Sequence, residues 1–452
     1  MKKFFFLFLA LGLIISGALP SFAGAHEFSK GKQHAFSKQL KAISKKTYRY
    51  FEDFTNEETG LPYDAVRMED GEISPQDFTS PTNIGIYFMS TVSAEEIGLI
   101  SREEAVSRIQ TSLKTLEEAE KWHGLFYNWY YTKDGSLMTD WGEFISTVDN
   151  GWLSAGLIVA GQAYPELNDQ TSKLVDAMDY STLYDPEVGQ MRGGYDVKTE
   201  SLTAHHYGAF YTEPRVASYI SIGKGDVPEE HWWKMYRTMP DSWDWQSQKP
   251  EGYTETYDGV DVFEGHYTYN DQKFVPSWGG SMFEALMPGL VLKEKELGKN
   301  ALGLNNKRHV DIQIEYATEE MGFSAWGLSP TATPDDYSEF GATPLGMSGY
   351  SAEGAIVTPH ATFLALDYAP KEVYKNLKTL KDFGAYGKYG FYDSVNVKTG
   401  EVTQAYLALD QGMSMVAIAN YLEDGIIKDY FHQDEIGKNP EDLLKKETFS
   451  IK

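Results

Sequence analysis

The chain of 452 residues contains no cysteine. Disulfide bonds, cysteine metal sites, a catalytic thiol and a lipid-modified cysteine are therefore excluded. Basic residues are also few, with 40 Lys and Arg against 66 Asp and Glu, which gives a net charge of −26. Because nucleic acids and anionic membranes attract basic patches, we expect neither as a partner.

Long apolar runs are absent after the first 25 residues, so we expect no membrane-spanning helix. Residues 1–25 combine two lysines, an apolar run and small residues before a plausible cut after Ala23 or Ala25. This pattern predicts a secretory signal peptide. No Pro/Ser-rich linker divides the remainder, and we expect a short leader at 26–32, one large domain at 33–430 and a C-terminal tail at 431–452. Exported proteins without cystine are more typical of bacteria, and we expect a secreted or extracytoplasmic monomer.

Common catalytic motifs are missing as well. The sequence has no Gly-x-x-x-x-Gly-Lys phosphate loop, no His-Glu-x-x-His metal helix and no Gly-x-Ser-x-Gly nucleophile elbow. The pair His205–His206 has no evident third ligand, and the acidic loop with Asp335, Asp336 and Glu339 lacks the spacing of a calcium loop. We therefore expect no metal and no cofactor, and a solvated acidic loop.

Two kinds of helical segment alternate along the chain. Six apolar, small-residue-rich segments follow capping residues, as buried helices do, and they begin after Ser80, Asp149, Thr212–Pro214, Ser281, Thr358 and Asp410. Amphipathic, charged segments lie between them, at 34–54, 101–122, 167–180, 229–239, 308–320 and 371–383. Six such pairs predict an all-α (α/α)6 barrel with buried helices inside and amphipathic helices outside; a plain helical bundle is the alternative.

Carboxylates stand at several of these helix starts. Asp410, in the apolar stretch YLALDQGMSM, would be costly to bury unpaired, but a helix N-terminus favours an anion. Asp149 and Glu213 hold similar positions, and Ser281 with Glu284 fits a capping box. Each acid could serve only as a cap or a first-turn acid. In the predicted barrel, however, parallel inner helices would bring these acids together around one bowl.

The loops expected at this bowl are rich in aromatic residues, such as GLFYNWYYTKDG at 124–135. Aromatic rings stack on sugar faces while acids and amides bind hydroxyls; packing in the core is the alternative for any single ring. The residues that we expect to contact a sugar are Trp129, Tyr130, Trp152, Trp278, Glu284, Trp326 and His360.

Carboxylate chemistry remains after these exclusions. Glycoside hydrolysis commonly needs a protonated acid at the leaving oxygen and an ionised partner that activates water or attacks the sugar. A glutamate near apolar walls can have a raised pKa and act as the acid. An aspartate at a helix N-terminus would stay ionised and suit the base.

Several motifs resemble the bacterial glucoamylase-like (glycoamylase) family, over about residues 35–425. They are SPTNIGIYFMSTVSAEEIGLIS, FYNWYY, STVDNGWLSAGLIVA, YTEPRVASYISIGKGDVPEEHWWKMYRT, PSWGGSMFEALMP, VTPHATFLALDYAP and LALDQGMSM. The family includes endo-β-1,2-glucanases, and related modules occur in cyclic β-1,2-glucan synthases. The resemblance implies an (α/α)6 barrel and an inverting mechanism. It also implies that Glu213 is the acid, Asp410 the base acting through a substrate hydroxyl, and Asp149 a carboxylate at the sugar-binding centre.

We therefore expect a secreted glycoside hydrolase acting on a polysaccharide or oligosaccharide, with β-glucan, including β-1,2-linked glucan, as the candidate substrate. Asp410 is expected to face Glu213 across a sugar. The alternatives are a non-catalytic glycan-binding protein and a transglycosylase that remodels exported glycans.

Overall fold

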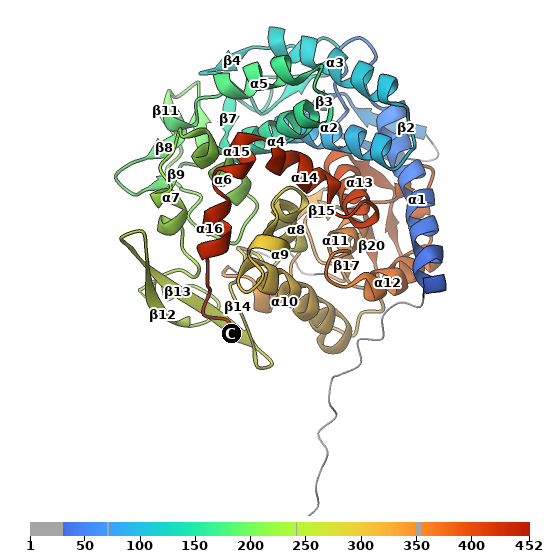
Figure 1. The fold of residues 1–452 in the computed structure, drawn as a ribbon. Helices are drawn as coiled ribbons and strands as arrows, with labels where there is room; N and C mark the ends of the chain where they lie inside the picture. Colours follow the sequence, from blue (N-terminus) through green and yellow to red (C-terminus); the bar gives the residue numbers. More distant parts are fainter. Residues whose placement is uncertain (1–29, 70–71, 241, 349–353) are drawn as a thin grey trace, which may run out of the picture.

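The computed structural model describes residues 30–69, 72–240, 242–348 and 354–452, so the predicted signal peptide and the start of the predicted leader lie outside the described residues. The molecule is mostly helical (Figure 1). The helices are α1 (Lys30–Asp53), α2 (Pro81–Glu96), α3 (Arg102–Glu118), α4 (Thr147–Ala163), α5 (Asn168–Ala177), α6 (Arg215–Lys224), α7 (Glu230–Lys234), α8 (Met282–Leu286), α9 (Glu294–Leu297), α10 (Leu302–Glu315), α11 (Pro359–Leu364), α12 (Pro370–Asp382), α13 (Ala408–Leu422), α14 (Ile426–Gln433), α15 (Glu435–Lys438) and α16 (Glu441–Lys446).

Short antiparallel strands connect many of these helices, which the prediction of an all-α fold did not include. They are β1 (Ala65–Glu69), β2 (Glu72–Gln76), β3 (Phe78–Thr79), β4 (Lys121–Trp122), β5 (Leu125–Phe126), β6 (Tyr130–Tyr131), β7 (Phe144–Ser146), β8 (Tyr184–Asp185), β9 (Gln190–Met191), β10 (Gly194–Asp196), β11 (Ser201–Leu202), β12 (Glu251–Tyr257), β13 (Val260–Tyr269), β14 (Gln272–Phe274), β15 (Thr331–Ala332), β16 (Tyr337–Ser338), β17 (Ile356–Val357), β18 (Tyr386–Gly387), β19 (Gly390–Phe391), β20 (Ser394–Asn396), β21 (Val402–Thr403) and β22 (Ala405–Leu407). Strands of two residues leave no periodic pattern to detect, but β12 and β13 have 7 and 10 residues, and their turn at Asp258–Gly259 is a hairpin signal that the prediction missed. The longest hairpin, β12–β13, lies at the lower left of Figure 1.

The apolar segments form the buried helices α2, α4, α6, α8, α11 and α13, and most start where the caps predicted. Ser80 caps α2 by accepting a hydrogen bond from the backbone amide of Asn83 at 3.1 Å, and Ser281 caps α8 in a capping box with Glu284. Two predicted starts were wrong. The cap of α4 is Ser146, and α13 begins at Ala408, so Asp149 and Asp410 lie inside the first turns of their helices.

The amphipathic segments pack against the outside of these buried helices. α3 contacts α2, α5 contacts α4, α7 contacts α6, α10 contacts α8, and α12 contacts α11, while α1 lies against α13 and α2. The buried helices also contact one another, α13 with α2, α2 with α4, α4 with α6, and α11 with both α13 and α8. The alternation of buried and amphipathic segments is thus an alternation of inner and outer helices.

Two glycines bring α2 and α4 unusually close. A Cβ atom added to Gly85 would lie 2.2 Å from the carbonyl oxygen of Trp152, and one added to Gly156 would lie 2.3 Å from the carbonyl oxygen of Gly85. No side chain larger than hydrogen fits between the two backbones at these points.

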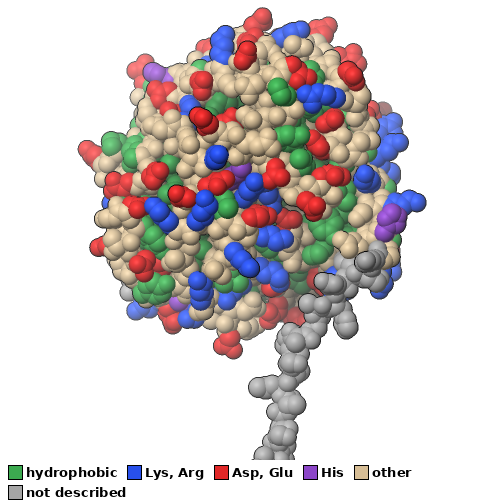
Figure 2. All heavy atoms as spheres, in the orientation of Figure 1, with side chains coloured by type: hydrophobic (Ala, Val, Ile, Leu, Met, Phe, Trp, Pro, Cys, Tyr) green, Lys and Arg blue, Asp and Glu red, His purple; other side chains and the backbone are tan. Residues whose placement is uncertain are grey.

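The short helices α14, α15 and α16 lie across one end of the helical assembly, in front in Figure 1. Gln162, near the end of α4, donates a hydrogen bond to Asp434 at 2.8 Å. Residues 431–452, predicted as a tail, contain α15 and α16 and bury Phe431, Leu444 and Ile451. On this face acidic and basic side chains are interspersed (Figure 2). Within the described part of the chain, no helix has the length and apolar character needed to cross a membrane.

Candidate active site

A cavity of about 770 Å³ lies where the N-terminal ends of α2, α4, α6, α8 and α13 meet. This agrees with the prediction that the starts of the buried helices converge. The residues that line the cavity include Asp64, Arg67, Thr82, Asn83, Trp129, Trp141, Asp149, Trp152, Glu213, Phe283, Asp335, Asp336, Tyr337, Leu407 and Leu409. Carboxyl groups and aromatic rings therefore share one concave space, as in many small-molecule sites.

Glu213 enters this cavity from the segment just before α6. Burial raises the pKa of the Glu213 carboxyl to about 8, and the negative charges of Glu284 and Asp149 add to this effect. At neutral pH the folded protein therefore holds Glu213 largely protonated. A protonated carboxyl in a cavity can donate a proton to a bound ligand, as the predicted role of general acid requires.

Asp149 lines the same cavity from the first turn of α4. Its Oδ1 accepts a hydrogen bond from the hydroxyl of Thr82 at 2.6 Å. The amide of Asn128, oriented so that both of its groups are satisfied, donates to Asp149 Oδ2 at 2.9 Å and accepts from Trp129 Nε1 at 3.2 Å. Burial raises the pKa of the Asp149 carboxyl, while the hydrogen bonds oppose that shift. These contacts fix the carboxylate in one orientation toward the cavity.

Asp64 is a third cavity carboxylate, and sequence reasoning missed it. Asn83 donates a hydrogen bond to Asp64 Oδ1 at 2.7 Å, and burial raises the pKa of Asp64 to about 6. The signal was present, because Asp64 interrupts apolar residues in the stretch GLPYDAV, as Asp410 does in its own stretch.

Asp410 lines a separate small pocket, and its charge interacts with those of Asp64 and Tyr337, which line the main cavity. Its Oδ2 is 3.1 Å from Nδ1 of His360, and the carboxyl of Asp393 lies beside it. Burial raises the pKa of Asp410 to about 7 and lowers that of His360 to about 4. Leu409, the residue before Asp410, lines the main cavity. One residue along α13 thus separates the two spaces.

Asp393 links this small pocket to the cavity wall. Its carboxylate accepts hydrogen bonds from the hydroxyl of Thr331 at 2.6 Å and from the amide of Ala332 at 2.7 Å. Burial and the charge of Asp410 raise the pKa of Asp393 well above its usual value. In the described part of the chain, His360, Asp393 and Asp410 form the one cluster whose geometry could hold a metal ion, with ligand atoms within 4.8 Å of one another.

The hairpin β15–β16 forms one wall of the cavity. Its loop residues Asp335 and Asp336 line the cavity and are exposed, so the prediction of a solvated loop is confirmed. Arg67 on β1 holds this loop by donating to the carbonyl oxygens of Thr333 at 3.0 Å and Asp336 at 3.4 Å. The backbone carbonyl groups of the loop are therefore bonded to the side chain of Arg67, which also lines the cavity.

The predicted sugar-contacting residues divide into two groups. Trp129 and Trp152 line the cavity, and Trp129 packs edge-to-face against Trp141 with ring centroids 5.2 Å apart. Trp141, which was not predicted, is 60% exposed. The structure does not bring the other predicted residues to the cavity wall: Tyr130 and Trp326 are core residues, Trp278 is exposed elsewhere, Glu284 is buried beneath the rim, and His360 lies beside Asp410.

Tyr130 and Glu284 illustrate why these residues lie outside the cavity. The hydroxyl of Tyr130 donates to the carbonyl oxygen of Glu120 at 2.7 Å and accepts from the amide of Tyr127, which are structural roles. The carboxylate of Glu284 accepts from the amide of Gly279 at 2.9 Å. Glu284 therefore acts on the site through its charge, which raises the pKa of Glu213.

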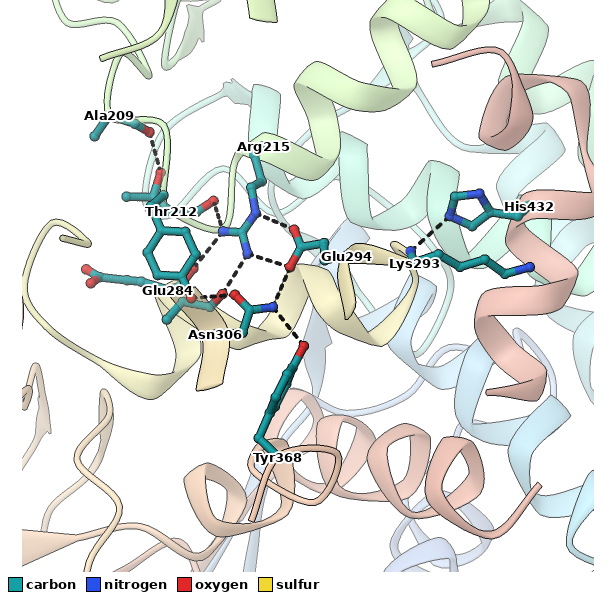
Figure 3. Close-up of polar contacts among 11 residues, drawn as sticks. Ala209, Thr212, Arg215, Glu284, Lys293, Glu294, Asn306, Tyr368 and His432 are labelled. Atoms are coloured by element: carbon teal, nitrogen blue, oxygen red, sulfur yellow. Dashed lines mark hydrogen bonds and ion pairs between the residues drawn. The ribbon is translucent and has the colours of Figure 1, made fainter. Parts of the chain in front are cut away.

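Arg215 ties the segment that carries Glu213 to α8 and α9 (Figure 3). Its guanidinium bonds both carboxylate oxygens of Glu294, at 2.7 and 3.1 Å. Its remaining donors bond the carbonyl oxygens of Thr212, Glu284 and Ala285 at 3.0, 3.3 and 2.6 Å. All five N–H groups of Arg215 are thus used, and the backbones beside Glu213 and Glu284 are held together.

Two family models match the chain. Residues 246–435 match the family described as "Putative glucoamylase", and residues 42–219 match a family described as a protein of unknown function (DUF3131). The first match confirms the resemblance to glucoamylase-like proteins that the motifs indicated.

Curated relatives and solved structures agree with this match. The cyclic β-(1,2)-glucan synthase NdvB of Rhizobium meliloti is 25% identical over 91% of this chain, and an exo β-1,2-glucooligosaccharide sophorohydrolase of Parabacteroides distasonis is 23% identical over 84%. The chain spans only 18% and 54% of the length of these two relatives.

Similar solved structures include the endo-β-1,2-glucanase of Chitinophaga pinensis, with a TM-score of 0.72 and 18% identity over 91% of this chain and 98% of that one. A β-1,2-glucanase of Parabacteroides distasonis has a TM-score of 0.76 and 18% identity over 91% of this chain and 60% of that one. At these identities the likeness establishes a shared, mostly helical fold. The relatives that have this fold include glycoside hydrolases.

Proposed function

We propose that this protein is a glycoside hydrolase that cleaves a β-glucan, with β-1,2-linked glucan as the leading substrate. The observation that carries the proposal is the position of Glu213, which lines a cavity shared with Asp149, Asp64 and indole rings and whose pKa is raised by burial to about 8. The β-1,2 linkage of the proposed substrate is taken from the relatives, because both curated relatives are enzymes of β-1,2-glucans. An exported location, based on the N-terminal pattern, is part of the proposal.

In the proposed mechanism Glu213 protonates the oxygen of the leaving sugar. Asp410 is the base that activates water through a substrate hydroxyl, and the product forms with inversion. Asp149 orients the sugar. Asp410 would act from the adjoining pocket, so its proton transfer requires a relay. Asp149 is the competing base because it already lines the cavity.

We also propose that the buried helices α2, α4, α6, α8, α11 and α13 close into one inner ring, which makes the fold an (α/α)6 barrel. The contacts between neighbouring buried helices support closure, and Arg215 bridges the remaining gap because it bonds the backbone of α8 from the start of α6. A closed ring explains why helix starts far apart in sequence line one cavity.

Transglycosylation is a second candidate reaction, favoured by the similarity of 91% of this chain to part of a glucan synthase. It would use the same acid but transfer the glycosyl group to a sugar hydroxyl instead of water. Purified protein should be incubated with soluble β-1,2-glucan, β-1,3-glucan, cellulose and starch, and the products read by mass. Short linear products from β-1,2-glucan alone are the expected result. Cyclic or lengthened products would identify transglycosylation, and no cleavage of any glucan would contradict both reactions.

The two candidate bases can be separated by matched substitutions. We expect Asp410→Asn to lower kcat by about 10²-fold or more with little change in KM, since loss of a general base typically costs 10²–10⁴-fold. Asp149→Asn should mainly raise KM, because its proposed role is to bind and orient the sugar. Steady-state kinetics on the cleaved glucan, with thermal unfolding as the folding check, decide between them. The reverse pattern would assign the base to Asp149.

A further inference from the structure

Three tryptophans form an exposed row outside the main cavity. Trp243, Trp245 and Trp278, called the tryptophan row below, are 40%, 50% and 37% exposed. The ring centroids of Trp243 and Trp245 are 5.8 Å apart, and those of Trp245 and Trp278 are 5.7 Å apart. Contiguous exposed apolar rings on a soluble protein commonly mark an interaction site.

The loop that carries two of these rings is held rigidly from below. The side-chain amide of the buried residue Gln246 donates to the carbonyl oxygens of Met239, Pro240 and Trp243 at 3.2, 3.1 and 3.1 Å. Its carbonyl oxygen accepts from the hydroxyl of Tyr267 on β13 at 2.8 Å. Gln246 therefore bonds the backbone on both sides of Ser242 and connects this loop to β13.

The third ring is fixed to the same support. The amide of Ser247 donates to the carbonyl oxygen of Met347 at 2.9 Å, and the amide of Ser348 donates to the carbonyl oxygen of Trp278 at 2.9 Å. Both tryptophan-bearing segments are thus paired with one strip of backbone. A surface whose rings are already in place loses little conformational entropy when it binds.

The backbone beside Trp278 is joined to the candidate active site through Glu284. Trp278 is followed by Gly279, whose amide bonds the carboxylate of Glu284 at 2.9 Å. The neighbouring ring of Phe283 lines the cavity, and the charge of Glu284 raises the pKa of Glu213. Trp278 is therefore the ring of the row that is connected to the cavity wall through α8.

We propose that the tryptophan row binds the part of a soluble β-glucan chain that extends beyond the cavity, which rests on the proposed function. Indole faces stack on the C–H faces of sugars, and the exposed polar groups of Ser242 and Asp244 beside the rings can bind hydroxyls. Neighbouring rings are tilted by 32° and 62°, so the surface is curved. A curved surface fits a bent, dissolved chain and not the flat face of a crystalline polysaccharide.

The test compares a double variant, Trp245→Ala with Trp278→Ala, against the parent, both in the Glu213→Gln background. This background removes cleavage, so binding to soluble β-1,2-glucan can be measured directly by affinity electrophoresis. We expect the double variant to bind the polymer about tenfold more weakly, which corresponds to about 1.4 kcal/mol. Tyr253→Ala, at an exposed ring on β12 outside the row, is the matched control and should bind like the parent. Thermal unfolding confirms that each variant is folded.

A second measurement separates this proposal from the proposed function. With Glu213 intact, the double variant should show a raised KM for the polymer but unchanged kcat and KM for a trisaccharide that fits within the cavity. If the protein with Glu213 intact binds the polymer but cleaves no glucan, and the double variant binds more weakly, the proposed hydrolase function is wrong and the proposed binding site is retained. Equal polymer binding by parent and double variant, or a parent that does not bind the polymer, would overturn the row. The proposal would also be overturned if the double substitution changed only the self-association of the protein, measured by sedimentation.

Discussion

Replacing Glu213 with Gln should lower kcat on the substrate glucan by about 10³-fold, within the 10²–10⁴-fold range typical of a lost general acid. Glutamine keeps the shape of the side chain but has no carboxyl proton to give to the leaving oxygen. Because Glu213 is already neutral at pH 7, the amide should also preserve the fold. Steady-state kinetics and thermal unfolding of the same preparation measure both effects.

A matched control exists at the exposed end of α3. Glu118→Gln makes the same chemical change at a solvated position and should leave kcat at the wild-type value. If Glu213→Gln retained kcat within twofold of wild type while Glu118→Gln behaved alike, Glu213 would not be the acid.

The pH dependence of kcat/KM tests the proposed roles of Glu213 and Asp410 in the protein without substitutions. In the proposed mechanism Glu213 acts only when protonated, so kcat/KM should fall as pH rises through about 8. Asp410 in that mechanism acts only when ionised, so kcat/KM should rise as pH rises through about 7. The expected profile is a narrow bell between these values, and Asp410→Asn should remove its acidic limb. A profile that is flat from pH 6 to 9 would contradict both roles.

The stability of the fold should depend strongly on Arg215. Arg215→Met should lower the free energy of unfolding by about 3–5 kcal/mol, the usual cost of removing one partner from a buried ion pair. Methionine fills a similar space but leaves the buried carboxylate of Glu294 without its cation. It also removes the side-chain donor to the carbonyl oxygen of Ala285, while the carbonyl oxygen of Thr212 keeps its bond from the backbone amide of residue 215. Urea unfolding measures the change.

An exposed ion pair provides the comparison. Arg102 and Glu166 approach to 2.8 Å, with both side chains 47% exposed, so Arg102→Met should cost less than about 1 kcal/mol. Adding Glu294→Met to Arg215→Met should recover part of the lost stability, because no unpaired charge then remains buried. Equal costs for Arg215→Met and Arg102→Met would show that the buried network contributes little.

The parts of the fold that local chemistry determines were predictable from sequence. Ser80 and Ser281 fixed the starts of their helices because a cap bonds amides only two or three residues away. Apolar runs also identified the buried helices, because a helix that is buried on all sides has no polar face.

Side-chain direction was harder to predict than helix position. Successive residues of an α-helix point about 100° apart, so Leu409 reaches the cavity while Asp410 reaches the adjoining pocket. Neighbouring residues of an extended segment point to opposite sides, so Trp129 lines the cavity while Tyr130 enters the core.

Contacts between distant parts of the chain left no local signal. Asp64 lies at the cavity, where Asn83 of α2 donates a hydrogen bond to it. Asp393 lies in a turn between two short strands, which places its carboxyl beside that of Asp410. Neither partnership follows from spacing, because each depends on how separate hairpins meet in three dimensions.

The close contact between α2 and α4 at Gly85 and Gly156 also limits the motion of the site. With backbone against backbone, there are no intervening rotamers through which one helix could slide on the other. We therefore expect Thr82 and Asp149, which sit on these two helices, to keep their 2.6 Å hydrogen bond while ligands enter and leave. A dipolar arrangement that does not have to reorganise during each turnover stabilises a developing charge more effectively than a mobile one. Adaptation to the length or shape of a ligand then falls to the loops of the rim, while the helical floor stays constant.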